Sequence, residues 1–323
     1  MEFFRYKKSI DFMSYTKKAM FLSLTFIALS YVLLFFKGLN YGVDFAGGTV
    51  IQVKYDKPAP IQQMRELLKK NPTFAGASIS EFGSDDEVLI RLKNSSTSVG
   101  QDIGDLASKA LKGSGNFEIR RVDIVGPKIG NELKEKGLIS LVLAITGILI
   151  YVAFRFEWRF AVASIIALVH DVSITMGFVS LFSIDVNLDV LAAILTILGY
   201  SLNDTIIVFD RIREGVTSSK TATLVGIINE SVTRTLARTT LTSLTTFFVV
   251  FTLFMFGGEI IHPFAFTLLV GVVVGTYSSI FVASPILVTF GFSVKEYKEK
   301  LAAKAKREAE KEKLRQQFES GVM

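Results

Sequence analysis

The sequence predicts a multi-pass α-helical membrane protein with six transmembrane helices and a small extracytoplasmic α+β domain, of ferredoxin-like βαββαβ order, between the first two helices. Half of the 323 residues are hydrophobic and 20% are charged, whereas soluble domains carry about 25% charged residues. Six apolar stretches are long enough to cross a hydrocarbon core of about 30 Å as helices. Between the first two lies a polar segment, 37–137, which is long enough to fold in water.

The six apolar stretches define the predicted domains. The first has a longer apolar run than the roughly 7–15 residues of a signal peptide and lacks an A-x-A-like site, so we expect an uncleaved anchor. The predicted spans are about 19–36, 138–154, 160–182, 188–209, 238–256 and 264–290. The chain then divides into the N-terminus with the first helix (1–36), the outer domain (37–137), helices two to six (138–290) and a basic cytoplasmic tail (291–323).

Lysine and arginine predict the orientation of these spans, because they gather in short cytoplasmic segments. With the N-terminus inside, the inner segments carry 5 such residues before span one and 2 between spans two and three. They carry 5 between spans four and five, with Arg238 at the boundary included, and 9 in the tail. The short outer loops, 183–187 and 257–263, carry none. We therefore expect a protein of the cell (inner) membrane with both termini in the cytoplasm. Topology then accounts for the net charge of +6 without a nucleic-acid partner.

The outer segment alternates strand and helix patterns. Thr49–Tyr55 alternates like a half-buried strand, and residues 60–70 form an amphipathic helical pattern that begins at Pro60. The remaining predicted elements are strands at Ala77–Phe82 and Glu87–Leu92, a helix at 98–112 and a strand at Phe117–Val125. This order fits a ferredoxin-like sheet with two helices on one face, a fold that hosts many functions.

Composition and motifs disfavour several kinds of chemistry. The absence of cysteine removes disulfides and thiolate sites, and two histidines are too few for a histidine-rich metal site. The glycine-rich segment 41–49 (YGVDFAGGT) matches neither common phosphate-binding motif and precedes a strand, so we interpret it as a tight connection. No Walker motif occurs elsewhere. We therefore expect neither an enzyme nor a cofactor or metal site.

Ionisable side chains inside the predicted spans are the strongest functional signal, because each costs about 2.5–3.5 kcal/mol at the centre of a membrane helix. Asp204 lies near the inner end of span four and Arg238 near the inner end of the antiparallel span five. Tyr200 shares a helix face with Asp204, whereas Asn203 points about 100° away. The arginine favours a charged acid and burial a neutral one. The pair is thus a proton relay, a permanent ion pair that joins two helices, or a site that only orders water.

A second ionisable pair, His170–Asp171, falls near the middle of span three. Histidine titrates near neutral pH, so one interpretation is a proton relay; the other is an interhelical hydrogen bond to a Ser or Thr. Gly271 and Gly275 form a G-x-x-x-G pattern, which is typical of close helix packing. The charged tail 295–319 predicts a solvated surface helix, with binding to lipid headgroups or a partner as the alternative.

Five segments in order along nearly the whole chain carry a family resemblance. They are YGVDFAGGT (41–49), VDIVGPKIGNEL (122–133), LVHDV (168–172), GYSLNDTIIVFDRIRE (199–214) and SVTRTLARTTLTSL (231–244). In this order and spacing they resemble SecF, the smaller partner in the bacterial SecD–SecF protein-export complex. The segment that ends span four is the most specific, and the basic tail contributes nothing to the resemblance.

The resemblance implies a resistance-nodulation-division type core that associates with SecD and, through SecD, with the SecYEG channel. It implies an accessory subunit that couples the proton motive force to the late, extracytoplasmic stage of preprotein translocation, with membrane lipids as further partners. The family's charged pair maps onto Asp204 and Arg238, and LVHDV makes Asp171 a second candidate. Two other functions remain open: half of a proton-driven small-solute or lipid exporter, and a scaffold of the channel that uses no protons.

Overall fold

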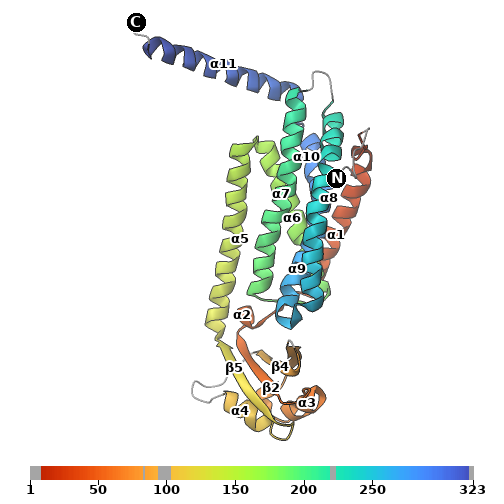
Figure 1. Ribbon diagram of the computed structural model, residues 1–323, viewed down its shortest axis with the longest axis vertical. Coiled ribbons are helices and arrows are strands. Elements are labelled where there is room, and N and C mark those ends of the chain that lie inside the picture. The colour runs from red at the N-terminus through yellow and green to blue at the C-terminus, as the bar shows by residue number, and fades with distance from the viewer. Residues whose placement is uncertain (1–8, 83, 94–102, 219–222, 320–323) are drawn as a thin grey trace.

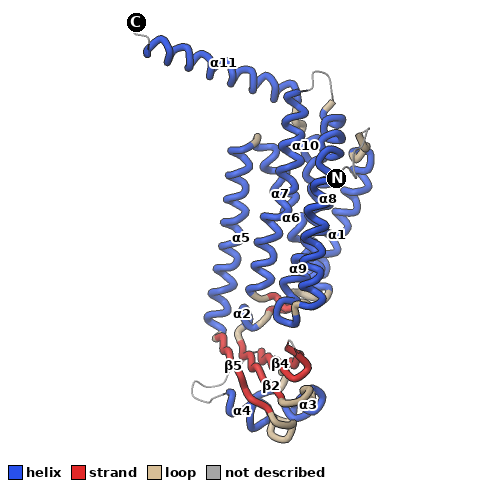
Figure 2. Tube along the Cα trace, viewed as in Figure 1, coloured by secondary structure: helices blue, strands red, loops and turns tan. Residues whose placement is uncertain are grey.

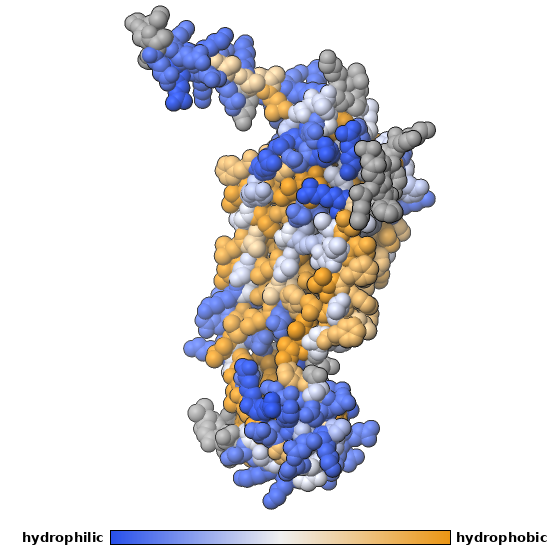
Figure 3. All heavy atoms as spheres, in the orientation of Figure 1, coloured by the Kyte–Doolittle hydropathy of each residue, from blue (hydrophilic) through white to orange (hydrophobic). Residues whose placement is uncertain are grey.

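The computed structural model describes residues 9–82, 84–93, 103–218 and 223–319. Figure 1 shows a bundle of long helices with a small α+β domain at one end and the helix α11 at the other. We refer to these as the domain end and the tail end of the bundle. On the face shown in Figure 3, hydrophobic side chains form a band around the bundle, and hydrophilic side chains gather at both ends. This band is the surface expected of a protein that spans a membrane.

Among the described residues, six helices are long and apolar enough to cross a membrane, which confirms the predicted multi-pass α-helical membrane protein. They are α1 (Thr16–Phe36), α5 (Pro127–Arg155), α6 (Trp158–Leu181), α7 (Leu188–Ser218), α8 (Leu224–Phe256) and α9 (Gly258–Ser278), the last continued by the π-helical turn η3 (Ser279–Ala283) and by α10 (Ser284–Thr289). Several run past the predicted spans, because polar residues extend a helix beyond the hydrocarbon. Thus α5 begins at Pro127 rather than near 138, and α8 at Leu224 rather than at Arg238.

The α+β domain contains one four-stranded antiparallel sheet. Its elements are β2 (Gly48–Tyr55), α3 (Ile61–Lys69), β3 (Ser78–Phe82), β4 (Ser84–Lys93), α4 (Ile103–Ala110) and β5 (Phe117–Val125), and the strand order is β3-β4-β2-β5. Alternate residues such as Ile51, Val53 and Ile90 pack against Met64 and Leu68 of α3 in one core. This is the period-two burial of a sheet that is covered on one face. The predicted helix start at 98–102 lies outside the described residues.

The glycine-rich connection holds this domain against the bundle. It contains β1 (Asn40–Tyr41), which pairs in parallel with β6 (Asp185–Val186) before α7, and a one-turn helix, α2 (Val43–Ala46). Gly48 has φ +147°, and a Cβ there would lie 2.1 Å from the Leu92 carbonyl oxygen. Only glycine fits so close to the neighbouring strand. These short elements are visible in Figure 2 between the sheet and the helices.

Strand β5 passes directly into α5 through a single residue, Gly126. Gly130, in the first turns of α5, lies against α2, because a Cβ there would be 3.0 Å from the Phe45 carbonyl oxygen. At the tail end, Arg155 near the end of α5 forms an ion pair with Asp210 of α7 at 3.5 Å. One helix therefore extends from the sheet to the opposite end of the bundle.

The tail forms the long helix α11 (Val294–Glu319), which runs away from the bundle in Figure 1. Its first turns are attached by an ion pair between Lys300 and Glu157 at 3.0 Å and by Tyr297, which packs against Phe292. The described part of α11 beyond these turns is exposed.

Candidate functional site

Asp204 lies inside the bundle on α7 and is 1% exposed. Its Oδ2 accepts a hydrogen bond from the Ser243 hydroxyl of α8 at 3.2 Å, and Thr276 of α9 donates to Ser243 at 2.8 Å. The acid is therefore enclosed by three helices, and its partners are neutral hydroxyl groups.

Three polar atoms near this point are buried without a hydrogen-bond partner among the described residues: Asp204 Oδ1, the Tyr200 hydroxyl and Thr239 Oγ1. Tyr200 lies one turn before Asp204 on α7, and Thr239 lies one turn before Ser243 on α8. Buried polar atoms without partners are rare and costly in native proteins. The interior around Asp204 therefore has hydrogen-bonding capacity that the described residues do not use.

Arg238 does not form the predicted ion pair with Asp204 in this structure. No salt bridge joins them within the described residues, and Arg238 is exposed on α8. The helix geometry explains the difference. Thr239 and Ser243, four residues apart, both point toward the bundle, so Arg238 points about 100° away from Thr239. Its charge acts on Asp204 only from a distance. Asn203 is exposed, in agreement with its predicted direction away from Asp204.

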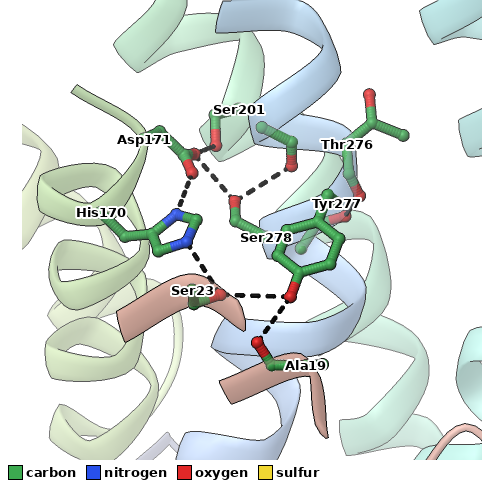
Figure 4. A network of polar contacts seen from close by, with 10 residues as sticks. Ala19, Ser23, His170, Asp171, Ser201, Thr276, Tyr277 and Ser278 are labelled. Atoms are coloured by element: carbon green, nitrogen blue, oxygen red, sulfur yellow. Dashed lines mark hydrogen bonds and ion pairs between the residues drawn. The ribbon is translucent and has the colours of Figure 1, made fainter. Parts of the chain in front are cut away.

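His170 and Asp171 of α6 form a second buried network with hydroxyl groups of α1, α7 and α9 (Figure 4). The exposed fractions are 3% for His170 and 0% for Asp171. His170 Nδ1 lies 2.8 Å from Asp171 Oδ1, and His170 Nε2 lies 3.1 Å from the Ser23 hydroxyl of α1. Asp171 Oδ2 accepts hydrogen bonds from Ser201 of α7 at 2.5 Å and from Ser278 of α9 at 2.8 Å. The sequence left two interpretations of this pair, a proton relay and interhelical hydrogen bonds to Ser or Thr. The structure contains the hydrogen bonds of the second interpretation.

The G-x-x-x-G pattern brings α7 and α9 close enough for these contacts. A Cβ on Gly271 would lie 2.2 Å from Ile197, and one on Gly275 would lie 3.0 Å from the Ser201 Cβ and 3.5 Å from Asp171 Oδ2. Ser201 and Asp204 lie one turn apart on α7, so this helix carries both networks. The Asp204 and Asp171 networks therefore form one polar layer through the bundle.

Apolar side chains close this layer toward both ends. Toward the domain end, Ala193 and Ile197 of α7 pack with Val250, Leu268 and Val272. Toward the tail end, a larger cluster includes the fully buried Val208, Phe209 and Ile212 of α7, together with Phe160, Ile228 and Leu287. The acids thus lie between two apolar layers, where a low dielectric constant makes electrostatic effects strong.

The hydroxyl groups that form the two networks around Asp204 and Asp171 were not predicted from the sequence. They are Ser23, Ser201, Ser243, Thr276, Tyr277 and Ser278. Ser201, Tyr277 and Ser278 lie within a turn of residues already singled out, Asp204 and Gly275. Their position on an otherwise apolar span is the signal that would have identified them.

Comparison with known proteins gives a consistent set of relatives. The chain matches the family models "Protein export membrane protein SecD/SecF, C-terminal" over residues 106–293 and "SecD/SecF GG Motif" over residues 32–59. It is 49% identical to protein translocase subunit SecF of Helicobacter pylori strain J99 over 321 residues, which cover 99% of each chain. It is 40% identical to the protein of the same description from Escherichia coli O157:H7, over 88% of this chain and 89% of that one.

Two solved structures share the fold. The crystal structure of SecDF from Thermus thermophilus superposes with a TM-score of 0.78 at 34% identity over 89% of this chain. A second structure, of SecDF in its super-membrane-facing form, gives a TM-score of 0.68 at 33% identity over 93% of this chain. The chain spans 39% and 40% of the length of these two solved chains.

Proposed function

The chain belongs to the SecF family of protein translocase subunits, and from this premise we propose that it works with a SecD partner to couple the proton motive force to the late, extracytoplasmic stage of preprotein translocation. The single observation that carries the proposal is Asp204, an acid that is 1% exposed and has one unpartnered oxygen inside a membrane-spanning helix. Acids in such positions are maintained where protons or ions move.

The proposed partners follow from length and family. The solved SecDF chains are more than twice as long as this one. In the proposed complex, a separate SecD chain supplies the part of those chains that this chain does not match. Through SecD the complex would reach the SecYEG channel and the emerging preprotein. Copurification of a SecD-like chain with this protein tests the partnership.

The proposed location is the cell (inner) membrane, with both termini in the cytoplasm. The hydropathy of six helices supports a membrane setting, and the distribution of lysine and arginine supports the orientation. In this orientation the domain end of the bundle is extracytoplasmic, where it faces the preprotein that leaves the channel.

The energy available from protons is sufficient for such a role. One charge that crosses a potential of 100 mV releases about 2.3 kcal/mol, before a pH difference adds to it. A two-state equilibrium shifts roughly fifty-fold with that free energy. The proton must bind the two states with different affinity. Asp204 would supply this difference if its surroundings, including the distance to Arg238, change between states.

The substitution Asp204→Asn tests the proposal, because it keeps the size of the side chain and removes its titratable group. In vesicles that contain SecYEG, SecD and this chain, we expect gradient-dependent preprotein export to fall to the level without a gradient, while assembly with SecD is unchanged. Glu214→Gln is the matched control, since Glu214 is an exposed acid on the same helix, paired with Arg211. If Asp204→Asn exports as the parent does, the chain is a scaffold that uses no protons.

A further inference from the structure

The hydrogen bonds around His170 can be oriented one after another (Figure 4). A carbonyl oxygen only accepts, so the Tyr277 hydroxyl donates to the Ala19 carbonyl at 2.8 Å. The Ser23 hydroxyl lies 3.2 Å from the Tyr277 oxygen and must therefore donate its proton to Tyr277. The Ser23 oxygen then accepts from His170 Nε2 at 3.1 Å. In this arrangement Nε2 carries a proton.

The hydrogen bonds of Asp171 decide where the remaining proton of the network lies. Oδ2 of Asp171 accepts from the Ser201 hydroxyl at 2.5 Å. It also accepts from the Ser278 hydroxyl at 2.8 Å, which shares its one proton with the Gly275 carbonyl at 3.1 Å. An oxygen that accepts these bonds carries no proton of its own. Oδ1 faces Nδ1 of His170 at 2.8 Å. A neutral imidazole with its proton on Nε2 has a bare Nδ1, which would repel a carboxylate oxygen at this distance. One more proton must therefore lie between Nδ1 and Oδ1.

We infer that His170 and Asp171 together hold one exchangeable proton in this conformation, and that its release reverses the chain of hydroxyl groups and frees Tyr277 from Ala19. When the proton leaves to water, the charge of the pair changes from 0 to −1. His170 then keeps one N–H, on Nδ1, which donates to the carboxylate. Nε2 becomes an acceptor for the Ser23 hydroxyl, and Tyr277 donates to Ser23 in place of Ala19.

Tyr277 of α9 is joined to α1 by two hydrogen bonds, with Ala19 and with Ser23, and the switch removes the first and keeps the second. Tyr277 immediately precedes Ser278 and the π-helical turn η3, where the helix is already irregular. The hydroxyl can therefore turn away from Ala19 without the loss of a regular helical segment. This inference deepens the proposed function, because it adds a second proton site and connects that site to a helix contact.

The other ionisable groups around the pair come from the helices that contact α6. From α1, the Tyr31 hydroxyl bonds to Ser173, one turn from the pair. From α7, Asp204 lies one turn beyond Ser201. From α9, Tyr277 is part of the network itself. Helix α5 carries no charged residue between Lys136 and Arg155, and neither η3 nor α10 carries any. Asp204 is thus the neighbouring acid whose charge bears on the pair.

Nitrogen NMR of the histidine ring tests the inference directly. The chain has two histidines, so a His262→Asn background leaves His170 alone in the spectrum. We expect ¹⁵N-histidine-labelled, full-length protein in phosphatidylethanolamine–phosphatidylglycerol vesicles to show a protonated Nε2 at acidic pH. After proton release at higher pH, the signal should invert to a protonated Nδ1 and a bare Nε2. A ring that keeps Nε2 protonated at every pH, or bare at every pH, overturns the inference.

Two tyrosine variants separate this switch from a structural effect. Tyr277→Phe removes the hydroxyl to which Ser23 donates, so Ser23 becomes free to donate to Nε2. The Nδ1–H form should then appear at a pH at which the parent still holds the Nε2 proton. Tyr31→Phe removes another hydroxyl bonded to α6, outside the network, and should behave as the parent. Identical spectra for both variants contradict the inference.

The ring spectra are recorded at equilibrium without export. A normal tautomer inversion together with unchanged export by Asp204→Asn would retain the switch and remove the proposed function. A ring that shows no tautomer inversion, together with loss of gradient-dependent export in Asp204→Asn, would retain the proposed function and remove the switch. If Tyr277→Phe does not fold, the pH series of the parent decides alone.

Discussion

At the scale of single residues, Arg238 forms no ion pair with Asp204 in this structure, and we propose that it acts through its charge alone. It is exposed on α8, and Ser243 occupies the position beside Asp204. We therefore expect Arg238→Gln to lower gradient-dependent export about tenfold or more, the effect of about 1.4 kcal/mol. Arg238→Lys should retain most of the activity, because it keeps the charge.

The measurement is the rate of preprotein export by vesicles with and without a proton gradient. Equal defects in Arg238→Lys and Arg238→Gln would show that the planar guanidinium is required. The arginine would then engage an acid in another conformation or on the partner chain.

The buried acids could be predicted from the sequence, but their partners could not. A charge in an apolar span is conspicuous because of its cost, so Asp204 and Asp171 stand out. Hydroxyl groups do not, because Ser and Thr can also bond to their own helix. Thr242 donates to the Arg238 carbonyl at 3.0 Å, whereas its neighbour Ser243 reaches Asp204. Only the packing of α7 against α8 decides between these two uses.

At the scale of elements, the junction between α2 and α5 depends on Gly130. A Cβ there would meet the Phe45 carbonyl oxygen at 3.0 Å and the Gly47 nitrogen at 3.1 Å, both backbone atoms. We expect Gly130→Ala to lower the free energy of unfolding by about 1–3 kcal/mol, as overpacking does. Calorimetry of the purified protein in detergent measures this change.

Gly147 provides a matched control on the same helix, since a Cβ there would meet nothing within 4 Å. Gly147→Ala should leave stability unchanged or raise it, because alanine favours a helix over glycine. A melting temperature of Gly130→Ala equal to that of the parent would show that α2 and α5 separate without cost.

The long elements follow from hydrophobic runs and alternation, and the structure contains all six apolar helices and the strands of the sheet. The short elements cannot be predicted from such local patterns, because they form by pairing between distant parts of the chain. β1 and β6 have two residues each and lie about 145 positions apart, as in the pair Asn40–Asp185. The turn η3 likewise lies between the buried residues Ser278 and Ser284, and no pattern in the sequence predicts it.

At the scale of the whole molecule, the proposed orientation can be measured with single cysteines, because the native chain has none to interfere. Lys109 in α4 and Ala302 in α11 are both exposed, at opposite ends of the molecule. We expect Lys109→Cys to react with a membrane-impermeant maleimide added to intact spheroplasts. Ala302→Cys should react only after the membrane is permeabilised. Labelling of Ala302→Cys in intact spheroplasts would reverse the proposed topology.

The passage of β5 into α5 through Gly126 has a mechanical consequence. The sheet is attached to the outer end of a 29-residue helix whose other end, at Arg155, contacts Asp210. Because this helix is continuous, a rocking motion of the sheet would also tilt α5 and displace its far end at Arg155. Helix α5 packs against α6, which carries His170 and Asp171, and against α7, which carries Asp204. In the proposed function, a shift of α6 or α7 would therefore be transmitted to the sheet through the side of α5.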